Sequence, residues 1–259
     1  TIIVNTAPNA GISSAVQICS GGPQVALIDL LDGTPDTGGS WTFGGLDHSQ
    51  FFDPTMDVSG AYLYTVAGLT PCVNATAQVQ VTLVPRPNAG TNGNLAACVG
   101  DDAIQLAAGL GGTPNAGGTW SDDDGTGQLT GGVLDATSLA PGTYHFTYTV
   151  AGTGPCPAAT AVVTLNLADA LDAGEDASVT ICQNQLLDLF SSLGGTPQPG
   201  GAWTDVNGCG GLIGGAFNGS STPANTTCEL RYVIPGTSSC ASDTAFVSVT
   251  VQEGPFAGC

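Results

Sequence analysis

Residues 143–150 read Thr-Tyr-His-Phe-Thr-Tyr-Thr-Val, so Tyr144, Phe146 and Tyr148 lie two positions apart. Successive side chains of an extended chain point to opposite faces, so the aromatic rings share one face and the Thr and His side chains share the other. Residues 163–167 repeat this spacing with Val, Leu and Leu. The period is typical of half-buried antiparallel strands. We expect strands at residues 103–108, 118–121, 128–134, 143–150 and 159–167.

The composition favours strands over helices and restricts the partners. Gly, Pro and Thr are abundant and Lys is absent. The only cations are Arg86 and Arg231, against 21 acidic residues, which gives a formal net charge of -19. Such a chain lacks the cations that bind nucleic-acid phosphates or anionic lipid, so we expect no nucleic-acid partner. No apolar run approaches the roughly 20 residues that span a bilayer, so we expect no membrane insertion of this segment.

The chain contains an internal repeat. Pro8-Asn9-Ala10-Gly11 returns as Pro87-Asn88-Ala89-Gly90, 79 residues later. Each copy also has a Gly-Thr-Pro, then a Gly-Gly before a Trp. The aromatic landmarks are Trp41, Trp120 and Trp203, with Tyr64, Tyr148 and Tyr232. A unit of about 80 residues has the size of a small domain.

Six or seven short strands per copy, separated by Gly, Pro and Asp turns, indicate a two-sheet sandwich with the repeated Trp and Tyr in its core. We therefore predict an all-β chain of three tandem immunoglobulin-like β-sandwich domains in an extended array. The predicted repeats are residues 8–86, 87–171 and 172–255. Residues 1–7 correspond to the last strand of a preceding repeat or to a donated strand, and residues 256–259 to the start of a further repeat.

Two cysteines recur in every repeat. The early cysteines are Cys19, Cys98 and Cys182, and the late cysteines are Cys72, Cys156 and Cys240. Their repetition in register predicts one disulfide within each repeat, which would stabilise it by about 4 kcal/mol in the chain-entropy model.

Three further cysteines fall outside this pattern. Cys209 and Cys228 occur only in the third repeat, and we expect them to bond to each other. Cys259 has two interpretations, a partner in a following repeat or an interchain bridge. Disulfides on this scale predict an oxidising, extracellular setting.

An acidic turn follows two of the three Trp residues. Asp122 and Asp124 precede Gly125, and Asp205 and Asn207 precede Gly208. We interpret the shared Asp-x-(Asp or Asn)-Gly element as a tight hairpin turn, because Asp-Gly and Asn-Gly supply the positive φ that such turns need. The alternative is a calcium site, which we keep as a hypothesis because Asp suits calcium loops. Otherwise we expect no cofactor.

The sequence carries no motif that would indicate an enzyme. It has no Gly-x-Ser-x-Gly, no His-Glu-x-x-His and no phosphate-binding loop. Its two imidazoles, His48 and His145, lie in different repeats, and His145 should face outward from its strand. An enzyme should show one site, whereas this chain shows three copies of a scaffold. We expect no enzymatic activity.

The assembled motifs resemble the immunoglobulin-like or PKD-like repeats of very large cell-surface proteins of the Bacteroidota, a group that includes gliding adhesins exported by type IX secretion. The residues that carry the resemblance are the linker 87–90, Cys98, the segments 110–114 and 117–120, and the run from Gly142 to Cys156. The resemblance implies a location outside the cell or on its surface and offers no catalytic residues. It also implies an O-glycosylation site at Thr244, within Asp243-Thr244-Ala245.

Two functional hypotheses follow. The first is a structural component of an extracellular surface filament or adhesin stalk built from disulfide-stapled repeats. Its partners would be neighbouring copies of the same repeat or chain, joined for instance when residues 1–4 are donated to a neighbouring sheet. The alternative is a glycan- or calcium-binding module of a secreted or surface protein, with the Gly-rich loop of the third repeat as the candidate site and surface glycans as partners.

Overall fold

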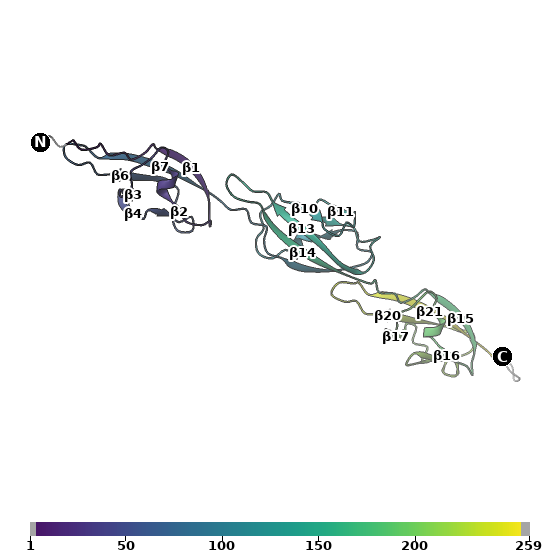
Figure 1. The fold of residues 1–259 in the computed structure, drawn as a ribbon. Helices are drawn as coiled ribbons and strands as arrows, with labels where there is room; N and C mark the ends of the chain where they lie inside the picture. Colours follow the sequence, from purple (N-terminus) through teal and green to yellow (C-terminus); the bar gives the residue numbers. More distant parts are fainter. Residues whose placement is uncertain (1–3, 255–259) are drawn as a thin grey trace. The chain divides into compact units, whose positions relative to one another are not determined.

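The computed structural model describes residues 4–254. Over this range the chain is all-β and consists of three tandem immunoglobulin-like repeats, each with a larger and a smaller sheet (Figure 1). The prediction of this fold class is confirmed. Residues 4–7 take part in no strand, while residues 1–3 and the expected further repeat at 256–259 lie outside the described part of the chain.

The larger sheet has the strand order β1-β7-β6-β3-β4 in the first repeat, β10-β13-β14-β8 in the second and β15-β21-β20-β17 in the third. Its strands are β1 (Ser14–Cys19), β3 (Ser40–Phe43), β4 (Leu46–His48), β6 (Gly60–Val66), β7 (Ala75–Val84), β8 (Gly93–Cys98), β10 (Thr119–Asp122), β13 (Gly142–Val150), β14 (Ala159–Ala168), β15 (Ala177–Cys182), β17 (Ala202–Asp205), β20 (Thr226–Ile234) and β21 (Asp243–Gln252).

The smaller sheet is built from strands of two or three residues and has the orders β2-β5, β11-β12-β9 and β16-β19-β18. Its strands are β2 (Val25–Ala26), β5 (Phe51–Phe52), β9 (Ile104–Gln105), β11 (Leu129–Thr130), β12 (Val133–Leu134), β16 (Leu186–Asp188), β18 (Leu212–Ile213) and β19 (Ala216–Asn218). Within residues 4–254, four short 3-10 helices complete the elements: η1 (Leu27–Leu30), η2 (Leu106–Gly109), η3 (Phe190–Ser192) and η4 (Gly219–Ser221).

The first long strand of each repeat runs parallel to the last. β1 pairs with β7, β8 with β14 and β15 with β21, each over six residues. Because the strands are parallel, the early cysteine at the end of the first strand lies beside the end of the last strand. Cys19 is opposite Val84, and Cys98 is opposite Ala168. The early cysteine therefore lies at the pole where the chain leaves the repeat.

The repeated Tyr closes the core of each sandwich. Tyr148 is 7% exposed, and its hydroxyl accepts a hydrogen bond from Gly118 N at 2.9 Å and donates one to Asn115 O at 2.7 Å. Its ring packs against Trp120 in a tilted arrangement with the centroids 5.0 Å apart. A Cβ on Gly118 would lie 2.5 Å from the Tyr148 ring. The second Gly of the Gly-Gly before each Trp is thus required by the approach of the Tyr.

The same arrangement recurs in the other repeats. The Tyr64 hydroxyl accepts a hydrogen bond from Gly39 N and donates one to Asp36 O. The Tyr232 hydroxyl accepts from Gly201 N and donates to Gln198 O. Of the predicted core residues, all three Tyr and Trp41 are buried, whereas Trp120 and Trp203 are half-buried.

The Pro-Asn-Ala-Gly landmark anchors the start of the repeat. Asn88 Nδ2 donates to Thr113 O at 3.0 Å, and Asn88 Oδ1 accepts from Gly90 N at 2.9 Å. Asn9 makes the same two contacts with Thr34 and Gly11 in the first repeat. The side chain therefore ties the entry of the repeat to its Gly-Thr-Pro loop, which explains why the two landmarks recur together.

The strand predictions differ from the structure in three places. Residues 103–108 form β9 followed by η2, because the Leu106 side chain turns into the core, where it is fully buried. Residues 128–134 form the hairpin β11–β12, which turns at Gly131 and Gly132 with positive φ. Finally, β8 was not predicted, since its sequence, Gly-Asn-Leu-Ala-Ala-Cys, lacks bulky alternating side chains.

Contacts along the chain divide it into two compact units. One contains residues up to 92 with 110–121 and 147–162, and the other contains 93–109, 122–146 and the residues from 163 onward. Because this division cuts through the second repeat, it does not test the predicted repeat boundaries. These boundaries stay a prediction.

Candidate functional site: cysteine joints between repeats

Two disulfides join consecutive repeats. Cys19 of the first repeat bonds to Cys156 of the second, with the Cα atoms 5.0 Å apart. Cys98 of the second repeat bonds to Cys240 of the third, with the Cα atoms 5.1 Å apart. The same rule gives both bonds: the early cysteine of one repeat pairs with the late cysteine of the next. Each bond lies inside one of the two compact units.

The prediction of disulfides within each repeat is wrong for Cys19 with Cys72, Cys98 with Cys156, and Cys182 with Cys240. The reason is the parallel first strand. Cys156 precedes β14, while Cys98 lies beside Ala168 at its far end. A strand of ten residues is about 30 Å long. A disulfide needs Cα atoms within about 7 Å, so the two cysteines of one folded repeat cannot meet.

In each joint, the late cysteine contacts the backbone of the chain that leads out of the preceding repeat. Cys156 Sγ is 3.4 Å from Val84 O, and Cys240 Sγ is 3.3 Å from Asp169 O. Val84 ends β7, and Asp169 directly follows β14. The late cysteine therefore contacts the chain just as that chain leaves the last strand of the preceding repeat.

The remaining five cysteines are a bonded pair and three single residues, Cys72, Cys182 and Cys259. Cys209 and Cys228 bond to each other, with the Cα atoms 6.0 Å apart, which confirms the predicted extra bond of the third repeat. Cys182 is disulfide-bonded. Cys72, expected in a disulfide, is a free thiol. Cys259 lies outside the described residues, so both of its interpretations stay predictions.

The acidic turns are not hairpins. β10 ends at Asp122 and belongs to the larger sheet, whereas the next strand, β11, belongs to the smaller sheet. Asp122 Oδ2 accepts hydrogen bonds from Thr126 Oγ1 and Gly127 N, both at 2.8 Å, and so directs the chain from one sheet to the other. Burial raises the pKa of the Asp122 carboxyl, but the hydrogen bonds from Thr126 and its neighbours outweigh this and lower the pKa.

The equivalent segment of the third repeat uses its carboxylate in the same way. Asp205 Oδ1 accepts from Gly208 N at 2.9 Å, and its Oδ2 accepts from Gly210 N at 2.8 Å. Asn207 is exposed. Of the three segments that directly follow a repeated Trp, the one in the first repeat forms a two-residue hairpin, where Phe43 pairs with Leu46 across two glycines of positive φ.

Asp124 is engaged with a strand of the larger sheet. Its Oδ2 lies 3.1 Å from Nδ1 of His145, whose side chain is 46% exposed and faces outward as predicted. Specific calcium binding by Asp122, Asp124, Asp205 or Asn207 stays a prediction. Among residues 4–254, no three His, Cys, Asp or Glu side chains are grouped as a metal site would require.

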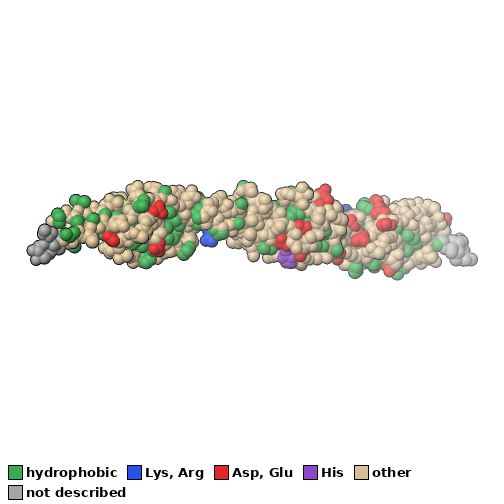
Figure 2. Space-filling model, turned by 45° about the horizontal axis from the view of Figure 1, so that its top comes forward, with side chains coloured by type: hydrophobic (Ala, Val, Ile, Leu, Met, Phe, Trp, Pro, Cys, Tyr) green, Lys and Arg blue, Asp and Glu red, His purple; other side chains and the backbone are tan. Residues whose placement is uncertain are grey.

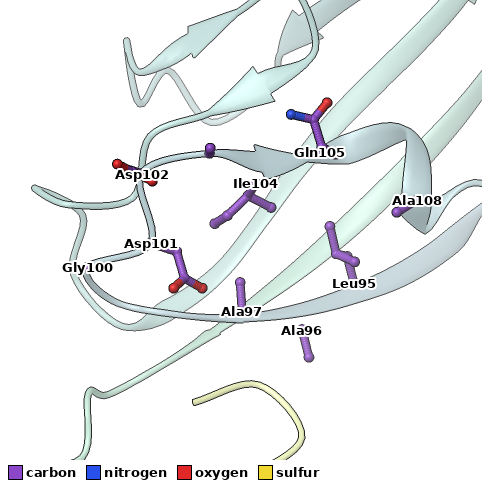
Figure 3. A pocket seen from close by; sticks show the side chains of 10 residues that line it. Leu95, Ala96, Ala97, Gly100, Asp101, Asp102, Ile104, Gln105 and Ala108 are labelled. Carbon is purple, nitrogen blue, oxygen red and sulfur yellow. The ribbon is translucent and has the colours of Figure 1, made fainter. Parts of the chain in front are cut away.

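A hollow of about 520 Å³ lies on the second repeat between β8 and the segment that carries β9 and η2 (Figure 3). Its lining is mostly small or apolar, as with Leu95, Ala97 and Ile104. Asp101 also lines it, but its carboxylate accepts a hydrogen bond from Cys98 N at 3.0 Å. The Asp101 carboxylate thus binds the backbone at the end of β8, where Cys98 forms its joint disulfide.

Acidic side chains are scattered across the face shown in Figure 2, and the Arg side chains occupy only small spots on it. Thr244, the residue for which the resemblance implies O-glycosylation, is exposed near the start of β21. None of the helices in residues 4–254 is long and apolar enough to cross a membrane.

The known proteins that are similar to this chain are solved structures of low sequence identity. No family model matches it, and neither does any curated protein. Similar solved structures include the I-band fragment I67–I69 of titin, with 12% identity, a TM-score of 0.44 and coverage of 96% of this chain and 100% of the fragment. Extracellular domains 3–5 of Drosophila OTK match with 11% identity, a TM-score of 0.35 and coverage of 95% and 96%. The four N-terminal Ig domains of a Dscam1 isoform match with 10% identity, a TM-score of 0.31 and coverage of 96% and 74%.

Proposed function

We propose that the chain is a structural segment of an extracellular surface filament or adhesin stalk whose consecutive repeats are joined covalently. The observation that carries this proposal is the pair of disulfides Cys19–Cys156 and Cys98–Cys240, each of which links one repeat to the next. A disulfide inside a domain stabilises that domain. A disulfide between domains instead keeps them attached when the linker or the fold fails, which is useful to a protein that bears load.

Two further features support the proposal. Disulfides persist in oxidising compartments, which agrees with a location outside the cell. The chain also offers trypsin-like proteases few cleavage sites. Arg86 is followed by Pro87, which blocks cleavage, and Arg231 lies within β20 between β17 and β21. A segment exposed to secreted proteases would benefit from both properties.

The joint can be tested with one substitution. Pro87→Ala exposes the bond after Arg86 to trypsin, and Arg86 is solvent-exposed. After cleavage the two fragments should migrate together on a denaturing gel and separate only when reductant is added, because Cys19 still holds Cys156. Fragments that separate without reductant would refute the covalent joint.

Two controls accompany this test. The unaltered chain should resist trypsin at the joint. The combined variant Pro87→Ala with Cys156→Ser should be cut in the same place and release its fragments without reductant. The comparison isolates the disulfide from any non-covalent contact between the repeats, since the denaturing gel removes those contacts.

A further inference from the structure

Cys72 occupies in the first repeat the position that Cys156 and Cys240 occupy in the second and third. All three lie in the loop that precedes the last strand of the larger sheet, three residues before that strand begins. In the two later repeats this cysteine is bonded to the early cysteine of the repeat before it. Cys72 is a free thiol.

The surroundings of Cys72 match those of its bonded counterparts. Cys72 Sγ lies 4.0 Å from Asn5 O, as Cys156 Sγ lies 3.4 Å from Val84 O. Asn5 corresponds to Val84, because both residues stand three positions before the Pro of the Pro-Asn-Ala-Gly landmark. Asn5 Nδ2 also donates to Thr70 O at 3.1 Å, which holds the loop against the incoming chain. The thiol is therefore placed on its linker as the two bonded cysteines are.

Cys72 is more exposed to solvent than its two disulfide-bonded counterparts. Cys156 and Cys240 are 4% and 5% exposed, whereas Cys72 is only half-buried. The loop around it also presents Leu69 and Val73, which are 70% and 82% exposed. A half-buried thiol beside exposed apolar side chains forms a surface that suits a protein partner.

We propose that Cys72 is a covalent docking site for a further immunoglobulin-like repeat that precedes residue 8 in the same polypeptide and carries an early cysteine at the end of its first strand. This inference rests on the proposed function, because it extends the rule of the two joints to a third. The bond forms when the two thiols lose two electrons and two protons to a disulfide oxidant, such as oxidised glutathione, which is reduced to two thiols.

A tandem duplication of the first repeat within the full chain tests the proposal. Residues 1–86 are followed directly by residues 8–259, which recreates the joint sequence Val-Pro-Arg-Pro-Asn of the natural chain. The first copy then supplies a Cys19, and the second copy supplies the Cys72 under test. Oxidation with the glutathione couple should bond these two residues, as identified by peptide mapping without reduction.

The count of maleimide-reactive thiols gives a second readout. Among the cysteines of the described residues, the natural chain and the duplicated chain should each label one, Cys72 of the most N-terminal repeat. Three labelled thiols, or a bond between Cys19 and Cys72 of the same copy, would overturn the proposal. The duplicated chain with Cys72→Ser in its second copy should label two, because the first copy's Cys19 then has no partner.

The duplicated chain also separates the two proposals. Its second copy retains the natural bond from Cys19 to Cys156, which reports correct folding and the covalent joint. If that bond forms and the new one does not, the docking site at Cys72 is wrong while the proposed function stands. If neither forms, the docking site at Cys72 and the covalent joint are both wrong, and the Pro87→Ala chain should release its tryptic fragments without reductant.

Discussion

The two joint disulfides overlap along the sequence, and this sets how far the chain can be pulled. The loop closed by Cys19 and Cys156 contains Cys98, and the loop closed by Cys98 and Cys240 contains Cys156. The shortest covalent path between the ends therefore enters at Cys19, crosses to Cys156, runs back to Cys98 and crosses to Cys240. It contains about 95 residues, whereas the whole chain has 259.

The lengths follow at about 3.5 Å per extended residue. With both joints intact, the chain cannot extend beyond about 330 Å. Without Cys19–Cys156 the limit rises to about 410 Å, and without Cys98–Cys240 to about 360 Å, because the remaining bond still bypasses most of the chain. Without both it rises to about 840 Å, since only the Cys209–Cys228 bond then shortens the path. Removing both joint disulfides thus lengthens the chain far more than the two single removals added together.

Single-molecule force spectroscopy on the chain, held at its two ends, measures these limits. Cys72, Cys182 and Cys259 are replaced by Ser in every arm, so that no other bond shortens the path. Each joint is removed by replacing both of its cysteines with Ser. A reductant added to the intact chain should lengthen it to about 900 Å. Extension well beyond 330 Å without reductant, or two single losses that add up to the double loss, would refute the connectivity.

Three further predictions concern the fold that carries the joints. Tyr148→Phe removes two part-buried hydrogen bonds, to Gly118 N and Asn115 O, and should lower the free energy of unfolding by about 1–3 kcal/mol in urea denaturation. Gly118→Ala should cost a similar amount, since its Cβ would lie 2.5 Å from the Tyr148 ring, whereas Gly142→Ala, with its nearest neighbour at 3.9 Å, should change stability by less than about 0.5 kcal/mol. Thr137 holds the pKa of Asp135 below its usual value by side-chain and backbone hydrogen bonds, so Thr137→Val should raise that pKa in an NMR titration. Because a lowered pKa stabilises the fold above the unfolded value near 3.8, the stability gap between variant and natural chain should shrink as the pH falls below it.

Much of the fold could be predicted because its signals are local. The alternation of Tyr144, Phe146 and Tyr148 needs only the two-residue period of a strand, and residues 142–150 form β13. The bond between Cys209 and Cys228 followed from their presence in one repeat only. Each of these signals compares residues within one segment or between copies, without knowledge of how the chain crosses the sandwich.

The joints could not be predicted from the same signals, because they depend on which pole of the sandwich each cysteine occupies. That in turn depends on the parallel pairing of β8 with β14, and β8 has the small side chains that a strand prediction misses. The prediction that the acidic turns are hairpins was wrong for a related reason. Asp122 stands at a change of sheet, and a local Asp-Gly pattern does not say whether the next strand pairs back or crosses over.

The connectivity also constrains the order in which the protein matures. In an unfolded chain the 58 residues from Cys98 to Cys156 close more readily than the 142 from Cys98 to Cys240, a preference of about 0.8 kcal/mol for the wrong pair. Only a folded repeat separates Cys98 from Cys156 and prevents that bond. Each early thiol must therefore stay reduced until its own repeat has folded and the following repeat has emerged and folded beside it. Premature oxidation would trap the chain repeat by repeat, so its maturation requires folding to run ahead of oxidation.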